Sequence, residues 1–201
     1  GMMAGTAAFT CLHDGGAAYA AAGVQHICFV ERSPGPNAPA LGFDYYALGC
    51  DMARRAVAEG CRSPAALLES HAFSSQSELL RGLRDVLDAR GLPLTCRQTE
   101  SSQCAGDAFD LLGGEAAPDV IFIGNYAFAQ TVRSIIRHFH EGSPRLYSVS
   151  PLFALPMGDF TEFEMNYRLL GRRAAERLIA QLEDEGAPAP LQTLPVDGVR
   201  S

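Results

Sequence analysis

The chain has 201 residues, 47% hydrophobic and 19% charged, which is the balance of a folded domain rather than a disordered segment. Its formal net charge is −7, and its 16 Lys/Arg positions are all arginine, so it lacks the basic face that nucleic-acid phosphates require. No apolar run approaches the roughly 20 residues needed to cross a bilayer, and no transmembrane helix is predicted.

Apolar periodicity, turn residues and helix caps predict an alternation of helices and strands. The expected elements, in chain order, are a helix over 15–22, a strand over 24–30, a helix over 47–60, a strand over 65–68, a helix over 75–89, a strand over 94–97, a helix from 101 or 102 to 112, a strand over 119–124, a helix over 127–139, a strand over 145–149, a strand from Phe160, a helix from Tyr167 and a last strand ending at 199–201. Such alternation favours an α/β architecture with parallel sheets and right-handed crossovers.

The clearest strand is DVIFIG at 119–124, which is wholly apolar after Asp119. Asn125 follows at its carboxyl end. The amide can contact a ligand, or it can cap the helix that comes next, and the sequence leaves both readings open.

The cysteines and histidines of the sequence do not predict a catalytic or metal-binding site. The six cysteines are widely spaced without a Cys-x-x-Cys pair, which, together with the lack of a secretory signal, predicts reduced thiols in a cytoplasmic protein. His138 and His140 lie two residues apart on a helix, so they face different directions, and no set of four metal ligands forms. Nucleophile-elbow and phosphate-loop motifs are missing from the sequence. No catalytic residue, metal or cofactor is predicted.

Four segments carry a resemblance to a known family: VQHICFVE at 24–31, FDYYALGCDMARRAV at 43–57, PDVIFIGNYAFAQTVRSI at 118–135 and YRLLGRRAAERLIAQLE at 167–183. In this order they resemble the effector-binding module of LacI/GalR-type transcriptional regulators, relatives of the periplasmic sugar-binding proteins. The resemblance implies a two-lobed periplasmic-binding-protein-like fold with parallel Rossmann-like sheets. The partial N-terminal lobe would comprise residues 1–42 and 164–188, and the C-terminal lobe residues 43–163 and 189–201.

In that family the ligand lies between the lobes, at the carboxyl ends of the strands. Carried onto this chain, the resemblance implicates Glu31, Phe43, Ser75, Asn125, Ser148, Met165 and Tyr167. Phe43 and Tyr167 are aromatic and can stack on a ligand or pack in the core. Leu79 replaces an arginine and Tyr126 an aspartate of the family, so the ligand is expected to be more apolar, or binding to be lost.

The resemblance also implies a function. The chain is expected to sense a small sugar- or nucleoside-like effector as a homodimer, without the family's helix-turn-helix headpiece and the start of its first lobe. DNA would then be reached only through a headpiece outside this chain. The incomplete lobe would expose a sheet edge, which is expected to rearrange or to be covered by a second copy. The alternative is a stand-alone solute-binding protein, and an enzyme using a scattered cysteine or histidine is the third hypothesis.

Overall fold

The computed structural model describes residues 6–9, 27–30, 40–70, 74–114, 117–139, 144–151, 158–183, 191–196 and 198–200. It divides into two compact units, each with its own sheet. Unit 1 comprises Gly1–Asp44 and Asn166–Pro195, and unit 2 comprises Tyr45–Met165 and Val196–Ser201. The predicted division differs in the last segment, where residues 189–201 were given to the C-terminal lobe but Leu191–Leu194 pair with a strand of unit 1.

Unit 1 holds a four-stranded parallel sheet and one described helix. The strand order is β1 (Thr6–Phe9), β2 (Ile27–Val30), β3 (Ala40–Phe43) and β9 (Leu191–Leu194). Helix α6 (Tyr167–Leu182) packs along β1, β2 and β3. Asn166 caps it, because its side-chain oxygen accepts a hydrogen bond from the Leu169 backbone N–H at 2.9 Å.

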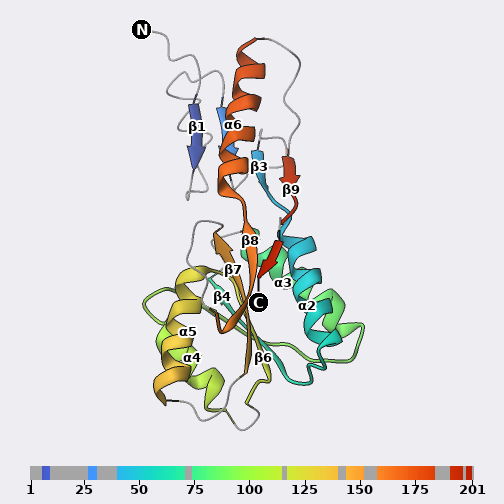
Figure 1. Cartoon of the computed structure of the whole chain (residues 1–201), viewed down its shortest axis with the longest axis vertical. Coiled ribbons are helices and arrows are strands. Elements are labelled where there is room, and N and C mark those ends of the chain that lie inside the picture. Colours follow the sequence, from blue (N-terminus) through green and yellow to red (C-terminus); the bar gives the residue numbers. More distant parts are fainter. Residues whose placement is uncertain are drawn as a thin grey trace. The chain divides into compact units, whose positions relative to one another are not determined.

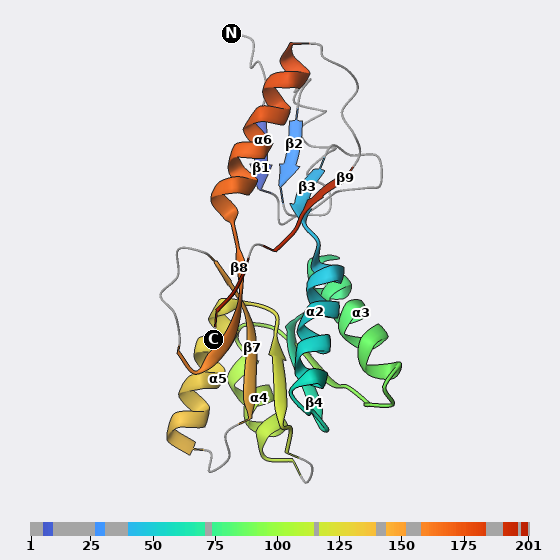
Figure 2. The ribbon, with the colours of Figure 1, turned by 45° about the vertical axis from the view of Figure 1, so that its right-hand side comes forward.

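Unit 2 is a six-stranded sheet with helices on both faces. Its strands run in the order β10 (Gly198–Arg200), β8 (Phe160–Met165), β7 (Arg145–Pro151), β6 (Val120–Ile123), β4 (Pro64–Glu69) and β5 (Thr95–Thr99). All neighbouring strands are parallel except β10, which is antiparallel to β8. The helices are α2 (Tyr45–Ala58), α3 (Ser74–Asp88), α4 (Cys104–Leu112) and α5 (Tyr126–Phe139). Within this unit α4 and α5 cover one face of the sheet, and α2 and α3 cover the other (Figures 1 and 2).

The core of unit 2 lies on both faces of β6, whose four residues are all buried. On the α4/α5 face, Ile121 and Ile123 pack with Phe128 and Val132 of α5. On the opposite face, Tyr147 lies between the rings of Phe122 and Phe163, with centroids 5.5 and 6.2 Å away. Burial on both faces explains why β6 reads as an uninterrupted apolar run.

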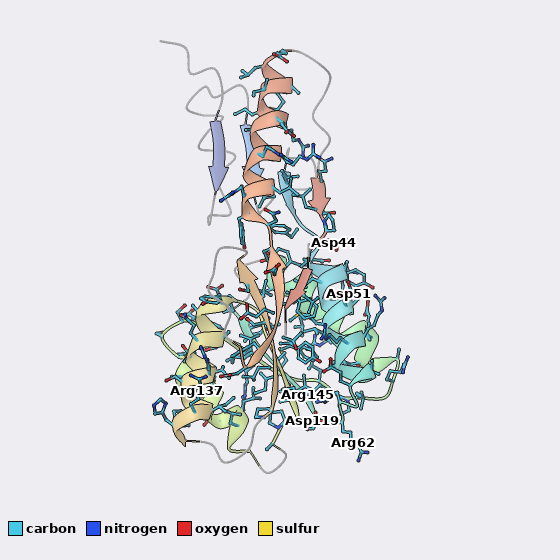
Figure 3. The ribbon with its side chains drawn as sticks, in the orientation of Figure 1. Asp44, Asp51, Arg62, Asp119, Arg137 and Arg145 are labelled. Atoms are coloured by element: carbon cyan, nitrogen blue, oxygen red, sulfur yellow. The ribbon has the colours of Figure 1, made fainter. Side chains whose placement is uncertain are left out.

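A carboxylate network stabilises the amino ends of the strands in unit 2 (Figure 3). The Asp119 carboxylate accepts hydrogen bonds from the backbone N–H groups of Arg62 and Ser63 at 2.8 and 2.9 Å. Burial, the largest single effect, would raise the pKa of Asp119, but these two bonds, the Cys61 hydrogen bond and the Arg145 charge together hold the pKa below its usual value. The Tyr147 hydroxyl donates to Glu59 at 2.5 Å and so lowers the pKa of Glu59.

Most of the predicted elements are confirmed within a few residues, including the strand at 119–124 and the helices starting near 47, 75, 127 and 167. The α/β class with parallel sheets is also confirmed. The expected cap at Ser101 or Ser102 is wrong, because α4 begins at Cys104 and its N-cap Gln103 makes no side-chain cap bond. The expected helix over 15–22 lies outside the described residues. None of the helices in the described ranges combines the length and the apolar character needed to span a membrane.

Candidate functional site

Polar side chains gather at the carboxyl ends of β4 and β6, two neighbouring strands of unit 2. Leu67 of β4 is in register with Ile123 of β6. Two residues beyond that pair, β4 ends in Glu69 and the chain after β6 reaches Asn125. The register therefore places a carboxylate beside an amide at the edge of the sheet where open α/β folds bind their ligands.

Asn125 makes two hydrogen bonds in this position. Its Oδ1 accepts from the Phe128 backbone N–H at 2.8 Å, which is an N-cap of α5. Its Nδ2 donates to Glu69 Oε2 at 3.4 Å. Of the two readings that the sequence left open, the cap is therefore present, and a ligand contact stays a prediction. Asn125 is half-buried, and an amide nitrogen carries two N–H groups, of which one is engaged in the contacts of the described residues.

Gln76, in the first turn of α3, connects this helix to the end of β6. Its Nε2 donates to the Gly124 carbonyl at 3.1 Å, and the residue is only 5% exposed. A Cβ on Gly124 would overlap Gln76 Oε1, so the glycine makes room for the side-chain amide. Among the described residues Oε1 has no hydrogen-bond donor. We call Glu69, Asn125, Gln76 and Gly124 the strand-end corner.

The other predicted ligand residues of unit 2 lie in different surroundings. Ser75 is half-buried and precedes Gln76 in the first turn of α3. Ser148 is fully buried within β7, and its hydroxyl donates to the Val149 carbonyl at 3.1 Å. Met165 is fully buried at the end of β8. Their contact with a ligand stays a prediction.

Two predicted residues meet in unit 1. The rings of Phe43, at the end of β3, and Tyr167, at the start of α6, pack edge to face with centroids 5.3 Å apart and planes at 83°. Phe43 is 4% exposed, so packing accounts for most of its surface. Glu31 lies outside the described residues.

Three described thiols have raised pKa values. Burial, with a smaller effect of the Asp119 hydrogen bond, raises the pKa of Cys61 to about 12. Burial also raises the pKa of Cys96 and Cys104. These thiols are protonated at neutral pH and are therefore poor nucleophiles. The described part of the chain holds no group of three or more His, Cys, Asp or Glu side chains suited to a metal ion.

Glu69 and Gln76 were not predicted as site residues. Glu69 directly follows the apolar run at 65–68, so its place at a strand end could be read from the sequence. Its contact with Asn125 could not be read from the sequence, because that contact depends on the β4–β6 register. Gln76 gave no signal, since a glutamine in a first helical turn is ordinarily solvated.

Solved structures share this fold. A periplasmic binding protein/LacI transcriptional regulator from Alkaliphilus metalliredigens QYMF, complexed with D-xylulofuranose, matches with a TM-score of 0.73 and 16% identity, over 88% of this chain and 69% of that one. The Cra transcriptional dual regulator from Pseudomonas putida, in complex with fructose 1-phosphate, matches with a TM-score of 0.78 and 16% identity, over 96% and 76%. A CelR–cellobiose complex matches with a TM-score of 0.75 and 17% identity, over 90% of this chain and 58% of that one.

No family model and no curated protein sequence matches the chain. At identities of 16 and 17%, the similarity concerns the fold. The chain therefore has the periplasmic-binding-protein-like fold of LacI-type effector-binding domains, which confirms the fold expected from the sequence and the resemblance that predicted it.

Proposed function

We propose that the chain is the effector-sensing part of a LacI/GalR-like transcriptional regulator and binds a sugar-like small molecule without transforming it. The observation that carries the proposal is the strand-end corner of unit 2, where Glu69 and Asn125 place a carboxylate and an amide side by side at the carboxyl ends of two parallel strands. Carboxylates and amides are the groups that hydrogen-bond hydroxyls, and this edge of the sheet is where α/β folds bind ligands.

The comparisons support the ligand class. The similar structures from Alkaliphilus metalliredigens and Pseudomonas putida and the CelR structure are each described as a complex with a sugar or sugar phosphate. Because those structures and this chain share the fold, we expect a ligand of this chain at the carboxyl ends of the strands. A binding role also agrees with the raised pKa values of Cys61, Cys96 and Cys104, which make an enzyme based on these thiols less favourable.

Ligand screening tests the proposal. A panel of pentoses, hexoses, disaccharides and nucleosides is added to the purified chain, and a ligand that binds the native state raises Tm. The Asn125→Ser variant is expected to weaken the binding of any hit about 10-fold or more, because serine can still cap α5 but cannot reproduce the amide. Asp51→Asn on the exposed surface of α2 is the control and is expected to leave affinity unchanged.

A panel in which no member raises Tm, or a hit whose affinity is unaffected by Asn125→Ser, would contradict the proposed site. The DNA role is a separate part of the proposal and requires a headpiece beyond these 201 residues. A hit that binds the chain tightly but changes no DNA binding of the full regulator would favour the stand-alone solute-binding alternative. The homodimer, the cytoplasmic location and the two-lobed mode of binding stay predictions.

A further inference from the structure

A small cavity lies at the amino ends of β4 and β5, at the opposite end of the unit 2 sheet from the strand-end corner. Its volume is about 170 Å³. Its lining includes the apolar side chains of Ala65 and Leu111, which are 1% and 7% exposed. Pockets for drug-sized ligands measure about 300–1,000 Å³, so this cavity suits a molecule of only a few heavy atoms.

The strand register brings two polar side chains of β5 to this cavity. Thr95 is in register with Ala65, and Arg97 is in register with Leu67. Ala65 and Leu67 belong to the core cluster that α4 and α5 cover, so Thr95 and Arg97 face the same side of the sheet as these helices. Asp110, in the last turn of α4, lines the cavity together with them.

The polar side chains of the cavity are not engaged within the fold. Four of them make no hydrogen bond and no ion pair in the described part of the chain, namely Ser63, Thr95, Arg97 and Asp110. Arg97 and Asp110 are exposed and have opposite charges, yet no ion pair joins them. The exposed Arg54 and Asp51 of α2, in contrast, pair directly at 2.9 Å. The cavity therefore offers one cation and one anion that a bound molecule can pair with.

The end of α4 adds to the negative charge on the Asp110 side. The carbonyl groups of its last turn give a helix C-terminus a partial negative charge. Helix α4 ends at Leu112 and has no basic residue in its last turn. A carboxylate at this position favours a cation beside it. The Arg97 guanidinium, for its part, can donate two parallel N–H groups to a carboxylate.

The rim of the cavity is fixed by Asp119, which is labelled in Figure 3. The Asp119 carboxylate accepts from the Ser63 backbone N–H at 2.9 Å, and the Asp119 backbone N–H donates to the Ser63 carbonyl at 3.1 Å. Pro64 follows Ser63 and Pro118 precedes Asp119, and both prolines line the cavity with a fixed φ. A cavity held in this way loses little conformational entropy when a ligand binds.

From these observations we propose that the cavity is a second binding site, which takes a small zwitterion with one carboxylate and one ammonium group, such as a short amino acid. The ligand carboxylate pairs with Arg97, the ammonium group pairs with Asp110, and the hydroxyls of Ser63 and Thr95 supply further hydrogen bonds. The inference goes beyond the proposed function, because it concerns the amino ends of the strands and does not depend on a sugar-like ligand at the strand-end corner.

The expected affinity is low. Both charged side chains are exposed, and exposed charge pairs contribute little, so a dissociation constant on the order of 1 mM is expected. Removing one charge from the ligand is expected to weaken binding about 3–5-fold. Salt screens such pairs, so the titrations are made at low ionic strength.

The first test varies the ligand. Titrations of the isotope-labelled full chain, followed by backbone amide chemical shifts, use glycine, β-alanine and γ-aminobutyrate, in which the separation of the two charges grows. Each is compared with its amide, which lacks the carboxylate charge, and with its hydroxy acid, which lacks the ammonium group. At least one amino acid is expected to shift the amides of Thr95, Arg97 and Asp110 saturably and to bind about 3–5-fold more tightly than both counterparts. Unshifted amides, or counterparts that bind equally well, overturn the inference.

The second test removes each charge from the protein. In Arg97→Gln the amino acid is expected to lose its advantage over the amide and keep its advantage over the hydroxy acid, and in Asp110→Asn the reverse is expected. The controls Arg54→Gln and Asp51→Asn remove the same charges from the exposed pair on α2 and are expected to leave both advantages unchanged. All four side chains are exposed, so the circular dichroism spectra of the variants should match the wild type. Equal effects in the cavity variants and the controls contradict the site.

Inorganic phosphate tests a simpler anion site. Phosphate that binds as tightly as the amino acid, with an affinity unaffected by Asp110→Asn, would overturn the zwitterion and leave only an anion contact at Arg97. Amino-acid binding that is weakened by Asn125→Ser and not by Arg97→Gln would place the ligand at the strand-end corner and overturn this site. A sugar panel without hits, in contrast, contradicts the proposed function and leaves this inference standing.

Discussion

Replacing Gly124 by alanine is expected to break the contact between α3 and the end of β6. A Cβ at residue 124 would overlap the Gln76 side-chain amide and lie 3.0 Å from Leu68 Cδ2. Leu68 is fully buried and cannot move away without disturbing its neighbours. The Gln76 side chain must therefore leave its place and lose its 3.1 Å bond to the Gly124 carbonyl.

The change in the free energy of unfolding can be estimated from these contacts. The lost hydrogen bond costs about 1 kcal/mol, and the overpacking against Leu68 and the displaced amide adds about 1–3 kcal/mol. Alanine recovers about 0.4–1 kcal/mol by reducing the entropy of the unfolded chain. The net loss in the free energy of unfolding is about 1–3.5 kcal/mol, which lowers Tm by roughly 2–14 °C in a chain of this size.

A double-mutant cycle identifies the cause. The chain has no tryptophan, so urea unfolding is followed by far-UV circular dichroism in the wild type, Gly124→Ala, Gln76→Ala and the double variant. Removing the glutamine side chain makes space for the new methyl group, so the double variant should be more stable than the sum of the single effects by about 1–2 kcal/mol. Single effects that add to within about 0.5 kcal/mol would refute the proposed contact.

Three further predictions concern the rest of unit 2. Gly49→Ala is expected to lower the free energy of unfolding by about 3 kcal/mol or more, because its Cβ would overlap the Leu79 carbonyl where α2 meets α3. A Cβ at Gly106 would have no atom within 4 Å, so Gly106→Ala should instead raise the free energy of unfolding by about 0.5–1 kcal/mol, as measured by the same urea unfolding. Asp119→Asn should lower the free energy of unfolding by about 1.5–3 kcal/mol at pH 7. Because the folded pKa of Asp119 lies below the unfolded one, this contribution is present above the unfolded pKa of about 3.9 and is lost as pH falls through the folded pKa, so the difference between wild type and variant should shrink in acid denaturation series below about pH 4. Cys61, with its pKa of about 12, should react with a thiol reagent at pH 7.5 far more slowly in the native chain than in urea, as followed by peptide mass spectrometry, and rapid native labelling would contradict its buried, protonated state.

Unit 2 could largely be predicted from the sequence because its elements carry local signals. The apolar run at 120–123 is buried on both faces, and the leucines of α3 recur at helical spacing on its buried side. Unit 1 was harder to predict. Strands β1, β3 and β9 have four residues each and were not predicted as strands. Such short segments become strands through pairing with partners far away in sequence, as Ala40 does with Leu191, and no local pattern encodes that pairing.

The candidate site was predictable in part for the same reason. The resemblance implicated Asn125, which directly follows the clearest strand, and in the structure it lies beside Glu69 at the carboxyl ends of β6 and β4. Glu69 and Gln76 complete the corner only through the register of β4 on β6 and the packing of α3 at Gly124. Those contacts are tertiary, so the partners of Asn125 could not be derived from spacing along the chain.

Carboxylates at the two ends of the sheet in unit 2 differ in how many hydrogen bonds they accept within the fold. At the amino ends, Asp119 accepts from two backbone N–H groups, and Glu59 accepts from the Tyr147 hydroxyl and pairs with Arg55. Those charges are satisfied within the fold, so removing one costs stability. At the carboxyl ends, Glu69 has one described hydrogen bond, a long one of 3.4 Å to an amide. A carboxylate held so weakly contributes little to folding, and Glu69→Gln should therefore leave Tm within a few degrees of the wild type in thermal melts.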